Sequence, residues 1–165
     1  MADHRYLIAL GSNMRHPRHG APPHVLRAAL AHLADDGLVV EASSPIVSSA
    51  PLGPSHRRYS NAAAIVRTPL NPPALLAHLK RIEAGFGRRP GGIRWRARVL
   101  DLDLILWSGG AYASPNLIIP HREFRHRSFV LQPASRIARD WRDPQTGLTL
   151  AHLHSRLTRP RAPTA

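Results

Sequence analysis

The stretch RVLDLDLIL, residues 98–106, is the clearest strand in this sequence, and it decides the class of fold that we expect. Side chains of a strand point alternately to its two faces. The pattern therefore places Asp101 and Asp103 on one face of a strand predicted over residues 98–107. The opposite face is filled by the intervening leucines: Leu100, Leu102, Leu104 and Leu106.

Other elements are predicted on both sides of this strand. Apolar or alternating runs predict strands at residues 6–10, 38–48 and 59–68, of which the second is weakened by Pro45. Helical spacing predicts helices at residues 22–35 and after the Asn71-Pro72 cap, and residues 124–134 are a candidate short helix. The order βαββαβ predicts an α/β (α+β) fold of the ferredoxin-like type. This is an antiparallel sheet with helices packed on one face, followed by a C-terminal extension made of short helices.

Length and composition narrow the classes of protein. The 165 residues fit a single domain over residues 1–158, with a frayed basic tail at 159–165. The absence of cysteine excludes disulfides, Cys-ligated zinc and thiol catalysis. No apolar run approaches the ~20 residues of a membrane span, and the MADHR start lacks a signal-peptide core, so we expect a cytoplasmic protein without a membrane partner.

The formal net charge of +13 predicts an anionic partner, whether nucleic acid, acidic lipid or nucleotide phosphate. Two carboxylates on one face repel each other unless a cation lies between them, and Mg²⁺ commonly takes one or two carboxylates together with phosphate oxygens. Spacing alone leaves open a surface strand whose acids pair with arginines. However, the acids directly follow the densest arginine cluster of the chain, which also contains Trp95 (Arg88, Arg89, Arg94, Arg96 and Arg98). Metal-binding acids, guanidinium groups and an aromatic ring are the parts of a phosphoryl-transfer site.

An ordered set of short motifs resembles the 6-hydroxymethyl-7,8-dihydropterin pyrophosphokinase family of folate biosynthesis. The resemblance runs from Tyr6 to about Pro133. Its landmarks are IALGSN (8–13), PLGP (51–54), YSNAA (59–63), RIE (81–83), GR (87–88), RW (94–95), RVLDLD (98–103), PH (120–121) and RSFVL (127–131).

The resemblance implies a ferredoxin-like fold and a reaction that moves the diphosphate of ATP to the pterin alcohol and releases AMP, with two Mg²⁺ ions. It implies that Asp101 and Asp103 bind the metal ions and act in catalysis with Arg88 and Arg98. The implied pterin contacts are Ser49, Leu52, Tyr59, Asn61, Trp95 and Phe129. The implied nucleotide contacts are Glu83, Leu104, His121 and Arg127.

The sequence departs from the family pattern at four places: Ser49-Ala50, Pro90, Arg96-Ala97 and Arg122. Two other functions stay open beside the enzyme: a non-catalytic nucleotide-binding relative and a basic RNA-binding module. RNA-binding sheets of this type display aromatic side chains on their central strands, and residues 7–9 offer none. We therefore expect ATP and a reduced pterin as partners, no nucleic acid, and a monomer.

Overall fold

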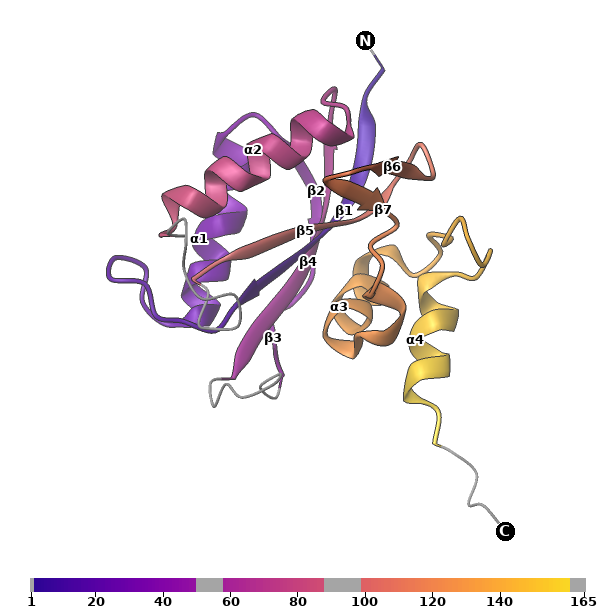
Figure 1. Cartoon of the computed structure of the whole chain (residues 1–165). Coiled ribbons are helices and arrows are strands. Elements are labelled where there is room, and N and C mark those ends of the chain that lie inside the picture. Colours follow the sequence, from indigo (N-terminus) through magenta and orange to yellow (C-terminus); the bar gives the residue numbers. More distant parts are fainter. Residues whose placement is uncertain (1, 50–57, 88–98, 161–165) are drawn as a thin grey trace.

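The fold is built on one antiparallel sheet with helices on its two sides (Figure 1). The structure is a computed structural model that describes residues 2–49, 58–87 and 99–160. In chain order its elements are β1 (His4–Ser12), α1 (Pro22–Asp35), β2 (Val39–Ser43), β3 (Val47–Ser49), β4 (Tyr59–Thr68), α2 (Pro72–Gly85), β5 (Asp101–Trp107), β6 (Tyr112–Ser114), β7 (Leu117–Ile119), the 3₁₀ helix η1 (Phe124–His126), α3 (Ser128–Ala138) and α4 (Leu150–Thr158). No helix within these ranges is long and apolar enough to cross a membrane.

Strand β1 is the centre of the sheet. The strand order is β2-β4-β1-β5, and β3 also pairs with β4. The register between β1 and β4 runs without a break from His4↔Thr68 to Ser12↔Ser60. Most residues of β1 and β4 are buried because both strands have neighbours on each side and packed layers on both faces, which explains their apolar sequences.

Helices cover both faces of the sheet, so the prediction of helices on one face was wrong. Helices α1 and α2 pack on one face, in a core with Tyr6, Ile8 and Leu10 of β1. Helices α3 and α4 pack on the other face, in a second core that includes Leu7 and Ile65 (Figure 1). The C-terminal extension therefore supplies a second layer, because the residues of β1 and β4 that point away from α1 are also apolar.

Several predicted elements are confirmed and others need correction. Helix α1 and strand β4 have the predicted bounds, and α2 begins at the predicted cap, where the Asn71 side chain accepts the Ala74 N–H at 3.0 Å. The strand predicted over residues 38–48 is two strands, because Pro45 has no N–H for the ladder. The helix predicted over residues 124–134 is interrupted at Arg127, whose backbone is extended, so that η1 and α3 are separate.

Two further differences concern strands. The hairpin of β6 and β7 lies where only short helices were expected. Strand β5 begins at Asp101, and the first part of its predicted range lies among residues 88–98, outside the described residues. It also contains a bulge, since Leu7 pairs with Leu106 whereas Ile8 pairs with Leu104. Leu106 therefore packs in the second core, on the face of the aspartates, and its predicted place on the opposite face was wrong.

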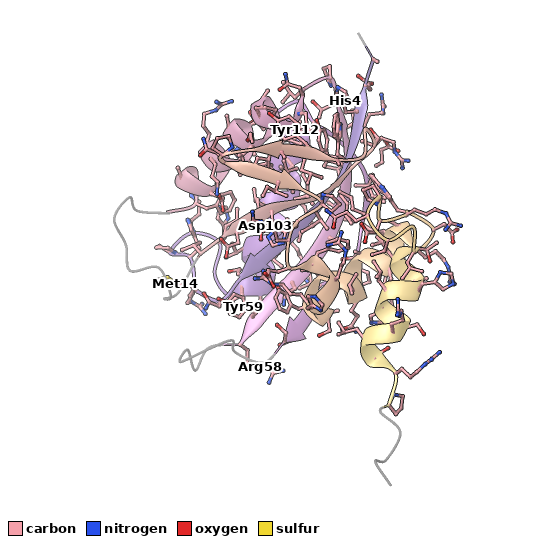
Figure 2. The ribbon with its side chains drawn as sticks, turned by 45° about the vertical axis from the view of Figure 1, so that its right-hand side comes forward. His4, Met14, Arg58, Tyr59, Asp103 and Tyr112 are labelled. Carbon is pink, nitrogen blue, oxygen red and sulfur yellow. The ribbon has the colours of Figure 1, made fainter. Side chains whose placement is uncertain are left out.

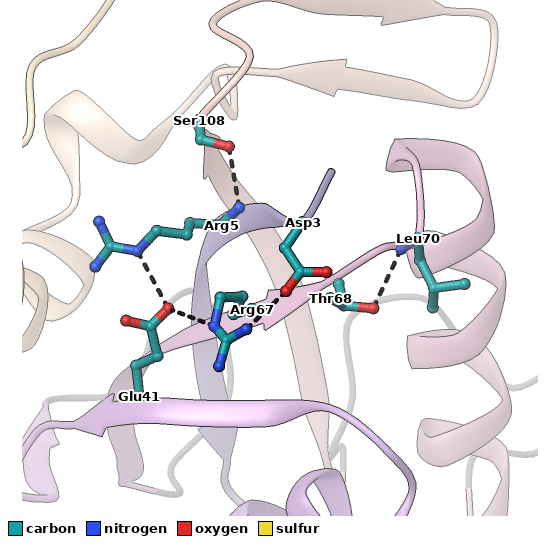
Figure 3. A network of polar contacts seen from close by, with 7 residues as sticks. All are labelled: Asp3, Arg5, Glu41, Arg67, Thr68, Leu70 and Ser108. Carbon is teal, nitrogen blue, oxygen red and sulfur yellow. Dashed lines mark hydrogen bonds and ion pairs between the residues drawn. The ribbon is translucent and has the colours of Figure 1, made fainter. Parts of the chain in front are cut away.

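A polar network joins the strands at one end of the sheet (Figure 3). Glu41 of β2 accepts from Arg5 of β1 at 3.3 Å and lies 3.5 Å from Arg67 of β4, which also pairs with Asp3 at 2.6 Å. The N–H of Arg5 donates to the Ser108 hydroxyl beyond β5 at 3.0 Å. Because Arg5 lies near the start of β1, this network holds the end of the sheet away from Gly11 and the aspartates.

Candidate active site

Two carboxylates and one amide share a face of the sheet at the end of β1. Asp101 pairs with Gly11 of β1, which in turn pairs with Asn61 of β4, and Asp103 pairs with Ala9. Directly opposed residues of an antiparallel sheet point to the same side. We call this side, the one bearing Asp101, Asp103 and Asn61, the carboxylate face. The sequence prediction that both aspartates lie on one face is in agreement with this register.

Small residues form the floor between these polar groups. Gly11 separates Asp101 from Asn61, and Ala9 lies beside Asp103. A Cβ atom added at Gly11 would lie 3.4 Å from Oδ1 of Asn61. The glycine hydrogen therefore leaves space above the sheet between a carboxylate and an amide.

Asp103, labelled in Figure 2, has a pKa that is shifted by its surroundings on the carboxylate face. Burial raises the pKa of Asp103, the Asp101 carboxylate raises it further, and His121, Lys80 and Arg127 partly oppose the shift. The two carboxylates thus repel each other, and His121 and Arg127 lie near enough to act on Asp103. A cation placed between the carboxylates would relieve this repulsion.

The segment after β7 brings His121 and Arg127 close to Asp103. The backbone N–H of His121 donates to the Ile105 carbonyl of β5 at 3.0 Å, which holds this segment against the strand. Nδ1 of His121 accepts the Glu123 N–H at 3.1 Å, so the neutral ring carries its proton on Nε2 and donates from there. Burial lowers the pKa of His121, which favours this neutral form. Arg127 ends the segment, and its guanidinium lies 5.6 Å from the ring centre of Phe129.

The other described site residues gather around Asn61. Its Nδ2 donates to the Ser49 hydroxyl at 2.7 Å, and Ser49 pairs with Tyr59, two residues before Asn61 on β4. Asn61 itself is 4% exposed, so the bond to Ser49 fixes the orientation of a buried amide. Phe129, on the first turn of α3, is partly buried against the core beneath this face.

Two predicted nucleotide contacts lie on the other side of the sheet. Leu104 is buried in the core under α1 and α2, so its side chain lies on the side of the sheet opposite to the carboxylate face. Glu83 of α2 is also buried, and its carboxylate accepts the backbone N–H of Leu102 at 3.2 Å. Four predicted site residues lie outside the described residues: Leu52, Arg88, Trp95 and Arg98.

The donor set fits Mg²⁺. Asp101 and Asp103 offer hard oxygen ligands on one face, and their mutual repulsion favours a bound cation. Within the described part of the chain, no group of three or more His, Cys, Asp or Glu side chains could hold a metal ion by itself. Mg²⁺ is commonly bound through one or two carboxylates and completes its shell with substrate oxygens and water.

Two features of this site were not predicted from the sequence. The first is the floor made by Gly11 and Ala9, although alternation along residues 6–12 places both on the face opposite Ile8 and Leu10. The second is the bond from Leu102 to Glu83, for which a sequence carries no signal because it depends on how α2 packs on β5.

Comparisons with known proteins identify relatives of this chain. The family model described as 7,8-dihydro-6-hydroxymethylpterin-pyrophosphokinase (HPPK) matches residues 7–139. A 2-amino-4-hydroxy-6-hydroxymethyldihydropteridine pyrophosphokinase of Synechocystis is 38% identical over 154 residues, which cover 91% of this chain and 74% of that protein. The protein of the same name from Pseudomonas aeruginosa is 39% identical, with 85% and 84% covered. A mitochondrial folate synthesis bifunctional protein of Arabidopsis thaliana is 37% identical, but the match covers only 26% of it.

Solved structures share the fold. The HPPK-DHPS protein of Plasmodium falciparum matches 94% of this chain with a TM-score of 0.72 at 12% identity. An HPPK-DHPS structure in complex with substrates matches with a TM-score of 0.74 at 11% identity. This chain spans 45% of the length of each of these two proteins. At such low identity the likeness concerns the fold alone.

Proposed function

The chain belongs to the 7,8-dihydro-6-hydroxymethylpterin-pyrophosphokinase family, and we propose that the carboxylate face is where its reaction takes place. The protein is a pyrophosphokinase that acts on hydroxymethyldihydropterin in folate synthesis, with ATP as the co-substrate. The observation that carries the assignment of the site is the register that brings Asp101, Asp103 and Asn61 to one face beside His121 and Arg127.

Asp101 and Asp103 are proposed to bind Mg²⁺. When bound there, Mg²⁺ neutralises charge on the phosphate oxygens during transfer. The Asp101 carboxylate raises the pKa of Asp103, and a cation bound between the two carboxylates would relieve this repulsion. Arg88 and Arg98 are assigned phosphate contacts on the resemblance alone.

The segment from His121 to Phe129 is proposed to contact the nucleotide and one side of the pterin ring. His121 donates from Nε2, because its Nδ1 already accepts from the Glu123 N–H, and a phosphate oxygen is a suitable acceptor. Arg127 supplies a guanidinium next to the ring of Phe129. Phe129 offers an aromatic surface to the flat pterin, together with Trp95 from the resemblance.

Asn61 and its neighbours are proposed to bind the polar edge of the pterin. With one amide hydrogen held by Ser49, Asn61 presents its remaining donor and its oxygen in a fixed orientation. Tyr59 lies on the same strand and face, and Leu52 belongs to the same pocket by the resemblance. A buried amide read in this way discriminates strongly between rings that can and cannot pair with it.

We also propose that the fold is of the ferredoxin-like type. The strand order β2-β4-β1-β5, with α1 between β1 and β2 and α2 between β4 and β5, supports this classification. A monomeric state, a cytoplasmic location and a single domain over residues 1–158 stay predictions from the sequence.

One assay tests the proposed reaction and its site together. The protein is incubated with ATP, Mg²⁺ and 6-hydroxymethyl-7,8-dihydropterin, and nucleotide products are separated. We expect AMP, formed only when the pterin alcohol is present, and no AMP from an Asp101→Asn variant that retains its fold. ADP as the product would mean transfer of the γ-phosphoryl group and would overturn the reaction. Normal turnover in the variant would overturn the site.

A further inference from the structure

Glu83 is a buried carboxylate on the side of the sheet opposite to the aspartates. It lies in the last turn of α2, and the residue is only 1% exposed. The core on this side of the sheet is apolar, and it includes Leu79 and Ile82 of the same helix and Leu102 of β5. Burying an ionised carboxylate is costly unless hydrogen bonds and charges compensate it, so the contacts of this group are informative.

The carboxylate oxygens of Glu83 have different partners. Oε2 accepts the backbone N–H of Leu102 at 3.2 Å, and Oε1 lies 3.2 Å from Nζ of Lys80. Lys80 is half-exposed, so its ion pair is solvated and weak. The bond to Leu102 is buried and charge-assisted, which makes it stronger than the contact with Lys80.

Leu102 is the residue between Asp101 and Asp103. Strand β5 has β1 on one side and is the last strand in its sheet order, so the peptide groups that point away from β1 need other partners. The Glu83 carboxylate provides an acceptor for one of these groups, at the middle of the pair of aspartates.

We propose that Glu83 is a positioning residue for metal binding, which fixes the β5 backbone between Asp101 and Asp103 and thereby sets the relation of their carboxylates. This inference rests on the proposed function of the carboxylate face. It assigns Glu83 a different role from the direct nucleotide contact that the family resemblance implies, because its carboxylate accepts the Leu102 N–H on the side of the sheet opposite to the aspartates. Groups that orient metal ligands affect metal affinity even though they never touch the ion.

Two double variants isolate the hydrogen bond from the charge. Lys80→Met with Glu83→Gln removes one positive and one negative charge but keeps an acceptor oxygen for the Leu102 N–H. Lys80→Met with Glu83→Met removes the same charges and the acceptor as well. The two proteins therefore have equal net charge, and only the one with glutamine at residue 83 keeps an acceptor for the Leu102 N–H. Lys80→Met alone controls for loss of the ion pair.

The first measurement is hydrogen exchange of the Leu102 amide in the ligand-free proteins. We expect exchange about tenfold faster in the double variant with methionine at residue 83, and near wild-type exchange in the double variant with glutamine. Unchanged exchange in the methionine variant would overturn the proposal, since the hydrogen bond would then not hold the strand.

The second measurement is Mn²⁺ binding in the presence of a non-hydrolysable ATP analogue. We expect affinity about tenfold weaker with methionine at residue 83, and within about threefold of wild type with glutamine and with Lys80→Met alone. Equal losses in both double variants would show that charge matters rather than the acceptor, and would overturn the proposal. If the methionine variant does not fold, the glutamine variant decides. A tenfold loss of Mn²⁺ affinity in that variant would show that charge matters rather than the acceptor, and would overturn the proposal.

This design separates the inference from the proposed function. If the wild-type protein forms no AMP, the proposed reaction fails, whereas amide exchange and Mn²⁺ binding need no turnover. If AMP is formed but the methionine variant binds Mn²⁺ like the wild type, the reaction stands and the positioning role of Glu83 falls.

Discussion

Substitution of Arg125 by methionine should destabilise the protein strongly through a single buried ion pair. The Arg125 guanidinium donates to both oxygens of Asp143, at 2.6 and 2.7 Å, and the Asp143 side chain is fully buried. The guanidinium also lies 4.7 Å from the ring centre of Phe124. In Arg125→Met the apolar part of the side chain is kept, but Asp143 loses its cation.

The magnitude follows from the burial of the carboxylate that is left behind. Removing one partner of a buried pair typically costs ~3–5 kcal/mol in the free energy of unfolding. Two bonds to Asp143 remain, from the Gln145 N–H at 3.0 Å and the Thr146 hydroxyl at 2.8 Å, and Arg125 is 17% exposed, so the lower end of this range applies. We expect a loss of ~3 kcal/mol, which for a chain of this size lowers Tm by roughly 6–12 °C.

Urea unfolding followed by circular dichroism measures this loss. The matched control is Arg139→Met, because Arg139 and Asp140 lie 4.0 Å apart with side chains 75% and 91% exposed. Such a pair contributes little, and we expect a change below about 0.5 kcal/mol. A loss below about 1 kcal/mol in Arg125→Met would refute the reasoning, since the carboxylate would then be compensated without its arginine.

Three further predictions use the shifted groups. The hydrogen bonds of Asp143 outweigh the effect of burial and lower its pKa below 3.8. Its contribution to stability should therefore persist above pH 3.8 and disappear as the pH falls through the native pKa. Acid unfolding of the wild type and of Arg125→Met tests this, because the free energy of unfolding should fall more steeply in the wild type. Asp103→Asn should reduce AMP formation by about 10²–10³-fold. With Mg²⁺ chelated, the free energy of unfolding at pH 7 should be unchanged or higher in this variant, because burial and Asp101 raise the pKa of the native carboxyl. A clear loss of stability in urea would contradict this. Tyr6→Phe should lower the free energy of unfolding by about 1 kcal/mol by removing the 2.7 Å bond to the Leu70 carbonyl, without changing turnover. Burial raises the pKa of Tyr6 to about 12. The wild type alone should therefore lose this stability as the pH rises above 10.0, where the phenol of the unfolded chain ionises.

Elements whose limits are set by their own residues could be predicted from the sequence. The Asn71 cap and the following prolines define the start of α2, and apolar spacing defines the buried stripe of α1. The placement of Asp101 and Asp103 on one face needed only the alternation of a strand. In these cases, the physical cause lies within a few neighbouring residues.

Features that depend on distant residues could not be predicted in this way. The row from Asp101 through Gly11 to Asn61 depends on the pairing of three strands that are far apart in the sequence. The second helical layer depends on the docking of α3 and α4 on β1 and β4, because either helix taken alone is only a short amphipathic segment. The link from Glu83 to Leu102 likewise follows from packing between elements.

The bulge in β5 connects these levels and explains where the carboxylate face ends. Up to Asp103, the strand presents acids on this face and leucines on the other, as a regular strand does. The extra residue at Ile105 places both Ile105 and Leu106 in the second core, so apolar side chains close the face directly after the second aspartate. The Ile105 carbonyl also accepts the His121 N–H, which brings the segment carrying His121 and Arg127 to the same point. One inserted residue therefore separates the polar site from the core beneath α3 and also anchors the cationic segment beside the carboxylates.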